Sequence, residues 1–177
     1  MRVVIVYESL FGNTREIAEA IAEGVRETYP AAAIDCVRAD EAAPERVGSP
    51  DLLVVGGPTH MRGMSSGLSR KMGLQAEKKE AAEGKPHHDP EPGAEGPGVR
   101  GWFHALPKTH GSPHAAAFDT RADIRMGGGA AHSIARKLRG HGYQLVAEPE
   151  GFIIEDTEGP LRAGERDRAR AWGMALN

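Results

Sequence analysis

Cysteine, excess charge of one sign and long apolar runs are all scarce in this sequence. Cys36 is the single cysteine among 177 residues, which excludes an internal disulfide and a zinc cluster held by thiolates. Crossing a membrane as a helix requires ~20 consecutive apolar residues, and no run approaches that length. No cleavage site follows the first apolar run, so we expect neither a signal peptide nor a membrane anchor.

The formal net charge of -3 favours neither nucleic acid nor an anionic membrane as the main partner. The apolar fraction of 40% and the charged fraction of 27% are typical of a globular protein outside membranes. A chain of this length is ordinary for one domain and short for two. We therefore expect one domain over residues 1–177, in a cytoplasmic protein.

Apolar patterns predict strands that alternate with helices. Continuous β-branched residues, as in Val3–Tyr7, are typical of a strand buried on both faces of a parallel sheet. Apolar residues four apart, as at Ile17, Ile21 and Val25, indicate a helix. The predicted strands are 3–7, 34–38, 51–57, 114–118 and a last strand over 143–154 that is interrupted near Pro149 and Gly151.

The helices predicted after the first and third strands each have a candidate N-cap. Asn13 or Thr14 is a good N-cap for the first helix, which must end before Pro30. Ser65 is a candidate cap for the helix after the third strand.

From Gly84 to Gly98 the chain is rich in Pro, Gly, His and Glu and shows no apolar period. We expect a mobile surface excursion at about 77–98 rather than a domain boundary.

Strands alternating with helices imply a doubly wound three-layer α/β sandwich, with helices on both faces of a parallel sheet. Five strands with an alternating second strand fit the order 2-1-3-4-5. In such sheets, ligands bind beyond the carboxyl ends of the strands, where the order reverses between strands one and three. The loops after Tyr7, Gly57 and Phe118 are therefore the candidate binding loops.

The first of these loops has the chemistry of a phosphate site without a lysine. It provides two hydroxyls, one side-chain amide and successive backbone N–H groups at a helix N-terminus. It lacks the Gly-Lys-Ser/Thr ending of a P-loop and the spaced glycines of a dinucleotide fingerprint. A well-capped strand-to-helix turn is the alternative. The loop consists of Ser9, Leu10, Phe11, Gly12, Asn13 and Thr14.

These residues resemble the flavodoxin family, whose motif is a hydroxyl residue, two variable positions and then Gly-Asn-Thr. Ser9 and Gly12–Thr14 match it. The resemblance continues in the loop Gly56–Met64 and, by position, in Phe118–Arg121. It implies a flavodoxin-like fold and bound FMN, with the phosphate on Ser9, Gly12, Asn13 and Thr14. Pro58, Thr59, His60, Met61, Arg62 and Gly63 would line one side of the flavin ring, and Asp119, Thr120 and Arg121 the other.

The two ring loops depart from the family pattern because neither contains Trp, Tyr or Phe. His60 and Met61 are the nearest substitutes, one a flat ring and the other polarizable. Arg62 and Arg121 would raise the flavin potential if they faced the ring, since a cation favours its anionic reduced form. Both arginines could instead point to solvent.

The predicted function is that of an FMN-binding redox protein, which exchanges electrons with a partner protein or a small acceptor. The sequence favours an electron carrier over an enzyme with its own substrate. An FMN-dependent NAD(P)H:quinone-type oxidoreductase is one alternative, with His60 as the candidate acid or base. A flavodoxin-fold interaction module without redox activity is the other. The sequence leaves the oligomeric state open.

Two further patterns are weak. Gly63–Gly67 matches the G-x-S-x-G pattern of serine hydrolases, but the preceding strand ends too early for the tight elbow that this motif needs. His87, His88 and Asp89 lie in the least regular segment without fixed ligand spacing, so a solvated loop is the better interpretation than a metal site. We predict no metal centre.

Overall fold

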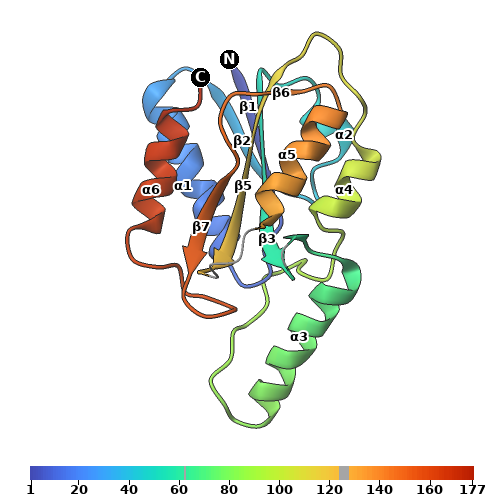
Figure 1. The fold of residues 1–177 in the computed structure, drawn as a ribbon, viewed down its shortest axis with the longest axis vertical. Coiled ribbons are helices and arrows are strands. Elements are labelled where there is room, and N and C mark those ends of the chain that lie inside the picture. The colour runs from blue at the N-terminus through green and yellow to red at the C-terminus, as the bar shows by residue number, and fades with distance from the viewer. Residues whose placement is uncertain (62, 124–127) are drawn as a thin grey trace.

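The computed structural model describes residues 1–61, 63–123 and 128–177. A parallel sheet forms the middle of three layers, with helices on both of its faces (Figure 1). The elements are β1 (Arg2–Tyr7), α1 (Asn13–Thr28), β2 (Ala33–Arg38), α2 (Pro44–Val47), β3 (Leu52–His60), β4 (Gly63–Met64), α3 (Gly67–Ala82), α4 (Val99–Ala105), β5 (His114–Ala122), α5 (Ala130–Gly140), β6 (Gln144–Leu145), β7 (Glu150–Ile154) and α6 (Glu165–Met174).

The strands are ordered β2-β1-β3-β5-β6, and β7 also pairs with β5. All these pairs are parallel. The predicted order 2-1-3-4-5 is confirmed when β6 and β7 are taken as the two halves of the interrupted fifth strand. The predicted count of five strands needs one correction, because β4 turns back antiparallel on the end of β3, with His60 opposite Gly63.

The central strands are the most buried part of the chain. Val3–Val6 of β1 and Leu53–Val55 of β3 are fully buried, as continuous apolar runs between two helical layers should be. β3 and β5 both extend beyond the predicted strands, to His60 and Ala122. These extensions carry the second and third binding loops outward from the carboxyl edge of the sheet.

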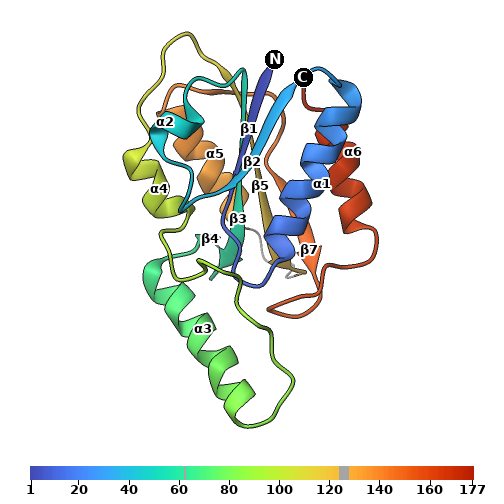
Figure 2. The same cartoon turned by 180° about the vertical axis from the view of Figure 1, so that it is seen from behind.

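Each face of the sheet has its own hydrophobic core. Ile17, Ile21 and Phe118 belong to the core under α1 and α6, and Trp102 and Ile134 belong to the core under α4 and α5. Figure 2 shows α1 and α6 side by side on their face of the sheet.

The two helices α1 and α6 meet almost backbone to backbone. A Cβ atom on Gly24 would lie 2.0 Å from the carbonyl oxygen of Arg170, and one on Gly173 would lie 2.4 Å from the carbonyl oxygen of Ile21. Glycine is therefore required on both sides of this contact, since any side chain would push the helices apart.

The predicted N-caps are wrong for both helices, Asn13 or Thr14 for α1 and Ser65 for α3. α1 begins after Gly12, which has a left-handed φ of 100°, and Asn13 is its first helical residue. Glycine adopts that conformation without the steric cost that a side chain brings. α3 is capped by Ser66 rather than Ser65, because the Ser66 hydroxyl accepts the Ser69 N–H while the Ser69 hydroxyl accepts the Ser66 N–H.

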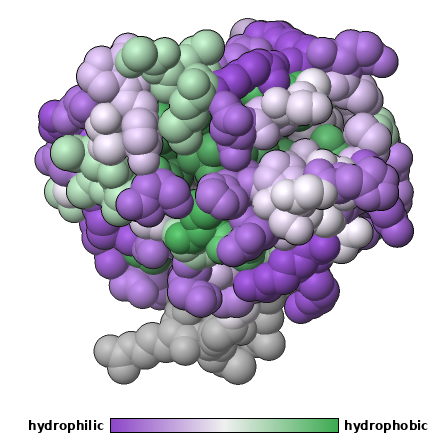
Figure 3. Space-filling model, turned by 90° about the horizontal axis from the view of Figure 1, so that it is seen from above, coloured by the Kyte–Doolittle hydropathy of each residue, from purple (hydrophilic) through white to green (hydrophobic). Residues whose placement is uncertain are grey.

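Helix α3 extends away from the three layers, and residues 83–98 return along it (Figure 1). Within its span only Glu77 is buried. No helix in the described part of the chain is long and apolar enough to cross a membrane. The end of the molecule that carries both termini is mostly hydrophilic, with hydrophobic residues showing between polar ones (Figure 3).

Candidate functional site

One cavity at the carboxyl edge of the sheet brings together residues from all three predicted loops. The first loop contributes five lining residues, the second three and the third one. The loop after β7 adds a fourth group that the sequence had not indicated. The lining residues are Ser9, Leu10, Phe11, Asn13, Thr14, Pro58, Thr59, His60, Thr120, Ile154, Thr157 and Glu158.

The first loop leaves the N-terminus of α1 without a side-chain cap. Its turn is closed by the Gly12 N–H, which donates to the Ser9 hydroxyl oxygen at 3.1 Å. The first N–H groups of a helix have no acceptor within the helix, and the helix dipole places partial positive charge there. An anion such as a phosphate would satisfy these groups.

A hydroxyl pair joins the first loop to the third. The Thr14 and Thr120 hydroxyl oxygens lie 2.7 Å apart, and both side chains are buried. This contact holds the end of β5 against the start of α1. It also occupies at least one hydrogen-bonding position of Thr14, one of the predicted phosphate ligands.

The loop after β7 covers the first loop. The Asn13 side-chain amide donates to the Glu158 carbonyl oxygen at 2.7 Å. Burial raises the pKa of the Glu158 carboxyl, and the nearby Glu77 carboxylate raises it further. Glu158 lines the same cavity as the candidate phosphate loop.

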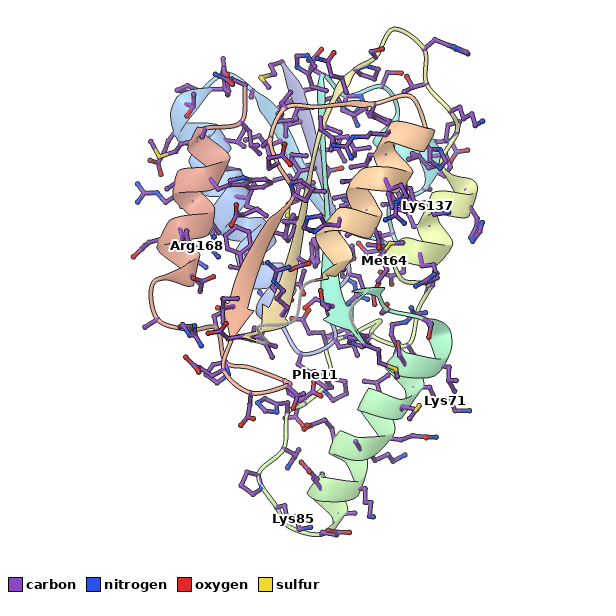
Figure 4. All side chains as sticks on the ribbon, viewed as in Figure 1. Phe11, Met64, Lys71, Lys85, Lys137 and Arg168 are labelled. Carbon is purple, nitrogen blue, oxygen red and sulfur yellow. The ribbon has the colours of Figure 1, made fainter. Side chains whose placement is uncertain are left out.

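Residues 87–91 lie against the outer side of the first loop. The Glu91 N–H donates to the Leu10 carbonyl oxygen at 2.7 Å, and the Arg15 Nε donates to the Glu91 carboxylate at 2.5 Å. The rings of Phe11 and His88 are 6.1 Å apart, on the side where the returning segment passes (Figure 4). This part of the predicted excursion thus contacts the candidate site; its mobility stays a prediction.

A larger cavity lies elsewhere, between α3 and residues 87–95. Its volume is about 920 Å³. Its lining mixes both signs of charge, with Arg70 and Lys78 near Glu91 and Glu95. This mixture gives no preference for one ligand charge, so we base the candidate site on the smaller cavity, where the predicted loops meet.

Glu8 connects the first loop to α3 and α4. It directly precedes Ser9, is buried, and accepts the Val99 N–H at 2.9 Å. It also accepts a hydrogen bond from the Ser65 hydroxyl, and its carboxylate lies 3.8 Å from the Arg70 guanidinium. A buried carboxylate with these partners fixes the end of β1 relative to both helices.

The second loop contributes a neutral imidazole. His60 Nδ1 lies 3.1 Å from the Ser69 hydroxyl oxygen. Burial lowers the pKa of His60, against the opposing effect of Glu8, so the ring is uncharged near neutral pH. Met61 is 93% exposed, and Arg62 lies outside the described residues.

The third loop turns two of its three predicted residues away from the cavity. Asp119 is fully buried, and its Oδ2 atom accepts the Ala131 N–H at the start of α5 at 2.9 Å. Arg121 donates to the Gly128 carbonyl oxygen at 3.2 Å, and its Nε atom lies 3.7 Å from Asp119 Oδ1. The Asp119 carboxylate thus partly offsets the charge of Arg121, which weakens any effect of that charge on a ligand.

Asp119 gives the apoprotein a testable pH dependence. Burial raises its pKa, although the Ala131 N–H and Arg121 oppose the shift. A carboxyl with a raised folded-state pKa stabilises the fold while it is protonated, and that stability is lost as pH rises through the raised pKa. We therefore expect Asp119→Asn to increase the free energy of unfolding at pH 7 and to flatten its pH dependence.

Urea unfolding of the apoprotein and the Asp119→Asn variant across mildly acidic to neutral pH would measure this effect. Asp123→Asn is the control, because Asp123 is exposed and paired with Arg162 at 2.9 Å. A lower stability of Asp119→Asn at pH 7 would show instead that the contact with Arg121 outweighs the cost of burial.

The cavity thus includes some of the predicted residues and leaves out others. The sequence did not identify Glu8, Thr157 or Glu158. Their signal was positional: Glu8 and the Thr157–Glu158 segment follow strands that end at the same carboxyl edge. The predicted residues that do not line the cavity are Gly12, Met61, Gly63, Asp119 and Arg121. In the described residues, no group of three or more His, Cys, Asp or Glu side chains is arranged to hold a metal ion.

Comparison with known proteins finds similarity to flavodoxins both in sequence and in fold. The family model of a flavodoxin domain matches residues 4–70, and no curated protein matches the chain. Flavodoxin 1 of Bacillus cereus is 18% identical with a TM-score of 0.65, covering 99% of this chain and 97% of that one. Flavodoxin 2 of the same organism is 15% identical with a TM-score of 0.67 and the same coverage. An archaeal flavodoxin is 18% identical with a TM-score of 0.61, covering 99% and 96%.

Proposed function

We propose that this chain, whose fold is flavodoxin-like and whose residues 4–70 match the family model of a flavodoxin domain, binds FMN at the carboxyl edge of the sheet and exchanges electrons through it. One observation carries this proposal: the three loops in which the sequence resembles the family line a single cavity. That cavity lies where the strand order reverses between β1 and β3, the expected ligand position in such folds.

The first loop fits a phosphate group. The uncapped N-terminus of α1 offers N–H donors and the positive end of a helix dipole. Ser9 and Asn13 add a hydroxyl and an amide at the cavity wall. Because Asn13 now donates to the Glu158 carbonyl, bound phosphate would compete with the loop after β7 for this amide.

Bound FMN would supply the chemistry of electron transfer, as flavins do in general. The chain's own residues would bind and orient it. Pro58, Thr59 and His60 line the cavity, and so does Thr120. Phe11 is the one aromatic side chain in this lining apart from the His60 imidazole.

The visible absorption spectrum of the purified protein, with and without added FMN, tests the proposal. We expect a yellow protein, or a colourless one that becomes yellow and quenches FMN fluorescence on titration. Riboflavin should bind more weakly, because it lacks the phosphate. A protein that binds neither flavin would overturn the proposal and favour the interaction module without redox activity.

Glu158 provides a finer test of the phosphate position. Glu158 lines the cavity with the first loop, and its carboxylate would repel a phosphate dianion bound there. We expect Glu158→Gln to tighten FMN binding about fivefold at pH 8 and to leave riboflavin binding unchanged. The gain should shrink as pH falls through the raised pKa of Glu158.

Fluorescence titration of both flavins measures this effect. Glu155→Gln is the matched control, since Glu155 is exposed and paired with Arg162 at 3.1 Å. An equal gain in riboflavin affinity would show that Glu158 does not act through the phosphate.

An FMN-dependent NAD(P)H:quinone-type oxidoreductase is the second candidate function, favoured by His60. Its imidazole lines the cavity and is held by the Ser69 hydroxyl. A neutral imidazole at a flavin edge could move a proton during substrate reduction. Steady-state oxidation of NADH or NADPH with a quinone would separate the enzyme from the carrier. Activity that survives His60→Gln unchanged would argue against this role for the imidazole.

A further inference from the structure

Acidic residues are absent from three long stretches of this chain. Residues 52–76, 96–118 and 130–147 contain no Asp or Glu. Residues 96–147 hold seven Arg and Lys against two Asp, whereas residues 1–51 hold five Arg against ten Asp and Glu. A net charge of -3 therefore conceals a strong separation of charge along the sequence.

The fold gathers these acid-free stretches on one side of the molecule. They form β3, β4, the first part of α3, α4 and α5. Arg100 of α4 donates to the Met64 and Ser65 carbonyl oxygens at 2.8 and 3.0 Å, and β4 contacts α5. Figure 4 shows Met64, Lys71 and Lys137 on this side, with Arg168 on the opposite side.

Apart from Arg70, which lies 3.8 Å from the Glu8 carboxylate, the basic side chains on this side have no acidic partner within the described residues. Lys71, Arg100, Arg136 and Lys137 are exposed, and none of them takes part in an ion pair with a described residue. On the opposite side the arginines of α6 are neutralised: Arg166 pairs with Glu23 at 2.6 Å, Arg168 with Glu165 at 2.6 Å and Arg170 with Glu27 at 2.5 Å.

Exposed apolar side chains gather beside these basic residues. Met61, Leu68 and Met72 are 93%, 71% and 59% exposed, and they are three of the five large apolar residues exposed in the described chain. Leu68 and Met72 share a helix face at four-residue spacing. The contact between His60 and Ser69 holds the Met61 turn against the first turn of α3.

We propose that this side is a docking surface for an acidic protein. Met61, Leu68 and Met72 form its apolar centre, and Lys71, Arg100, Arg136 and Lys137 form its basic rim. Apolar residues within a polar rim are the usual anatomy of a protein interface. An acidic partner supplies the charges that the rim lacks, which would orient the encounter.

The charge separation favours a compact acidic protein over an extended polyanion. A nucleic acid duplex or an anionic bilayer extends beyond the patch and would meet the acidic remainder of the molecule. The apolar centre adds contacts that a phosphate backbone does not use. Since His60 both precedes Met61 and lines the candidate FMN cavity, a docked partner would lie beside the flavin.

The role of this surface in electron exchange rests on the proposed FMN function, but its affinity for acidic peptides does not. The probes are two short peptides of equal charge, one of glutamate alone and one with Leu and Phe between the glutamates. Titrated into ¹⁵N-labelled apoprotein, both should shift amide signals of β4, α3, α4 and α5. The mixed peptide should bind more tightly, and salt should weaken both.

Charge reversal tests the rim. Lys137→Glu should weaken binding of both peptides about three- to tenfold. Arg26→Glu is the matched control, because Arg26 is exposed on α1, has no ion-pair partner among the described residues and changes the net charge equally. Met72→Ser should weaken the mixed peptide alone, and Met174→Ser, at an exposed methionine of α6, should weaken neither.

Three outcomes would overturn the proposal: shifts on α1 and α6 instead, equal losses in the variants and their controls, or tighter binding to a DNA duplex or to phosphatidylglycerol vesicles than to the peptides. Failure to bind FMN would refute the proposed function and leave the peptide result standing. Peptide binding without charge dependence would refute the docking surface and leave FMN binding untouched.

Discussion

Gly12→Asp should weaken FMN binding about 100-fold relative to Gly12→Asn, a difference of about 2.7 kcal/mol. Both variants place a branched side chain at the left-handed φ of 100° that starts α1, so their backbone cost is similar, and Asn and Asp tolerate this conformation better than other residues. They differ in one negative charge beside the proposed phosphate. Repulsion between that charge and a dianion is the expected cause of the loss.

The choice of aspartate separates binding from folding. A carboxylate at the start of a helix interacts favourably with the helix dipole, so Gly12→Asp should be at least as stable to urea as Gly12→Asn. A Cβ atom on Gly12 would lie 3.4 Å from the Glu91 carboxylate and 3.5 Å from the Arg15 guanidinium, so the added carboxylate would have a cation beside it as well as an anion. Similar FMN affinities in the two variants would place the phosphate elsewhere.

Phe118→Ala should lower the free energy of unfolding by about 3–5 kcal/mol, as loss of a buried aromatic ring does. Phe118 is fully buried and packs edge-on against Phe152 and Trp172, at centroid distances of 6.3 and 6.5 Å. This cluster closes the core between the sheet, α1 and α6. Urea unfolding measures the loss, and Phe118→Leu should cost clearly less because it leaves a smaller cavity.

The ring of Phe118 also explains why Gly56 has no side chain. The two residues are partners in the register of β3 and β5, and a Cβ atom on Gly56 would lie 2.1 Å from the ring. Gly56→Ala should therefore be strongly destabilising in the native background and much less so in Phe118→Ala. A double-mutant cycle measures this coupling, and additive effects would contradict the packing described here.

The helices and strands were predictable because the spacing of apolar residues along the sequence reflects how many faces of each element are buried. The continuous apolar runs of β1 and β3 indicate strands covered on both sides, and the four-residue spacing of Ile17, Ile21 and Val25 indicates the buried face of α1. The first loop was predictable for a related reason. A strand, a turn with a glycine and a helix must place backbone N–H groups at the edge of the sheet.

The remaining features depend on tertiary contacts that leave no local pattern. The N-cap of α1 is Gly12 rather than Asn13 or Thr14 because of the backbone conformation at Gly12. Rules about capping side chains do not predict such a cap. The contact of Glu91 with Leu10 is made by backbone atoms, so no apolar period marks it. Thr157 and Glu158 escaped notice because the last strand lies away from the point where the strand order reverses.

The close contact of α1 and α6 has a consequence for the order in which the chain folds. Gly24 and Gly173 lie 149 positions apart in sequence, so the first helix receives its outer partner only when the last one has been synthesised. Until then, the apolar residues that α6 covers remain open to solvent. A nascent or truncated chain lacking α6 should therefore be prone to aggregation and should recruit chaperones, although its candidate phosphate loop is already complete.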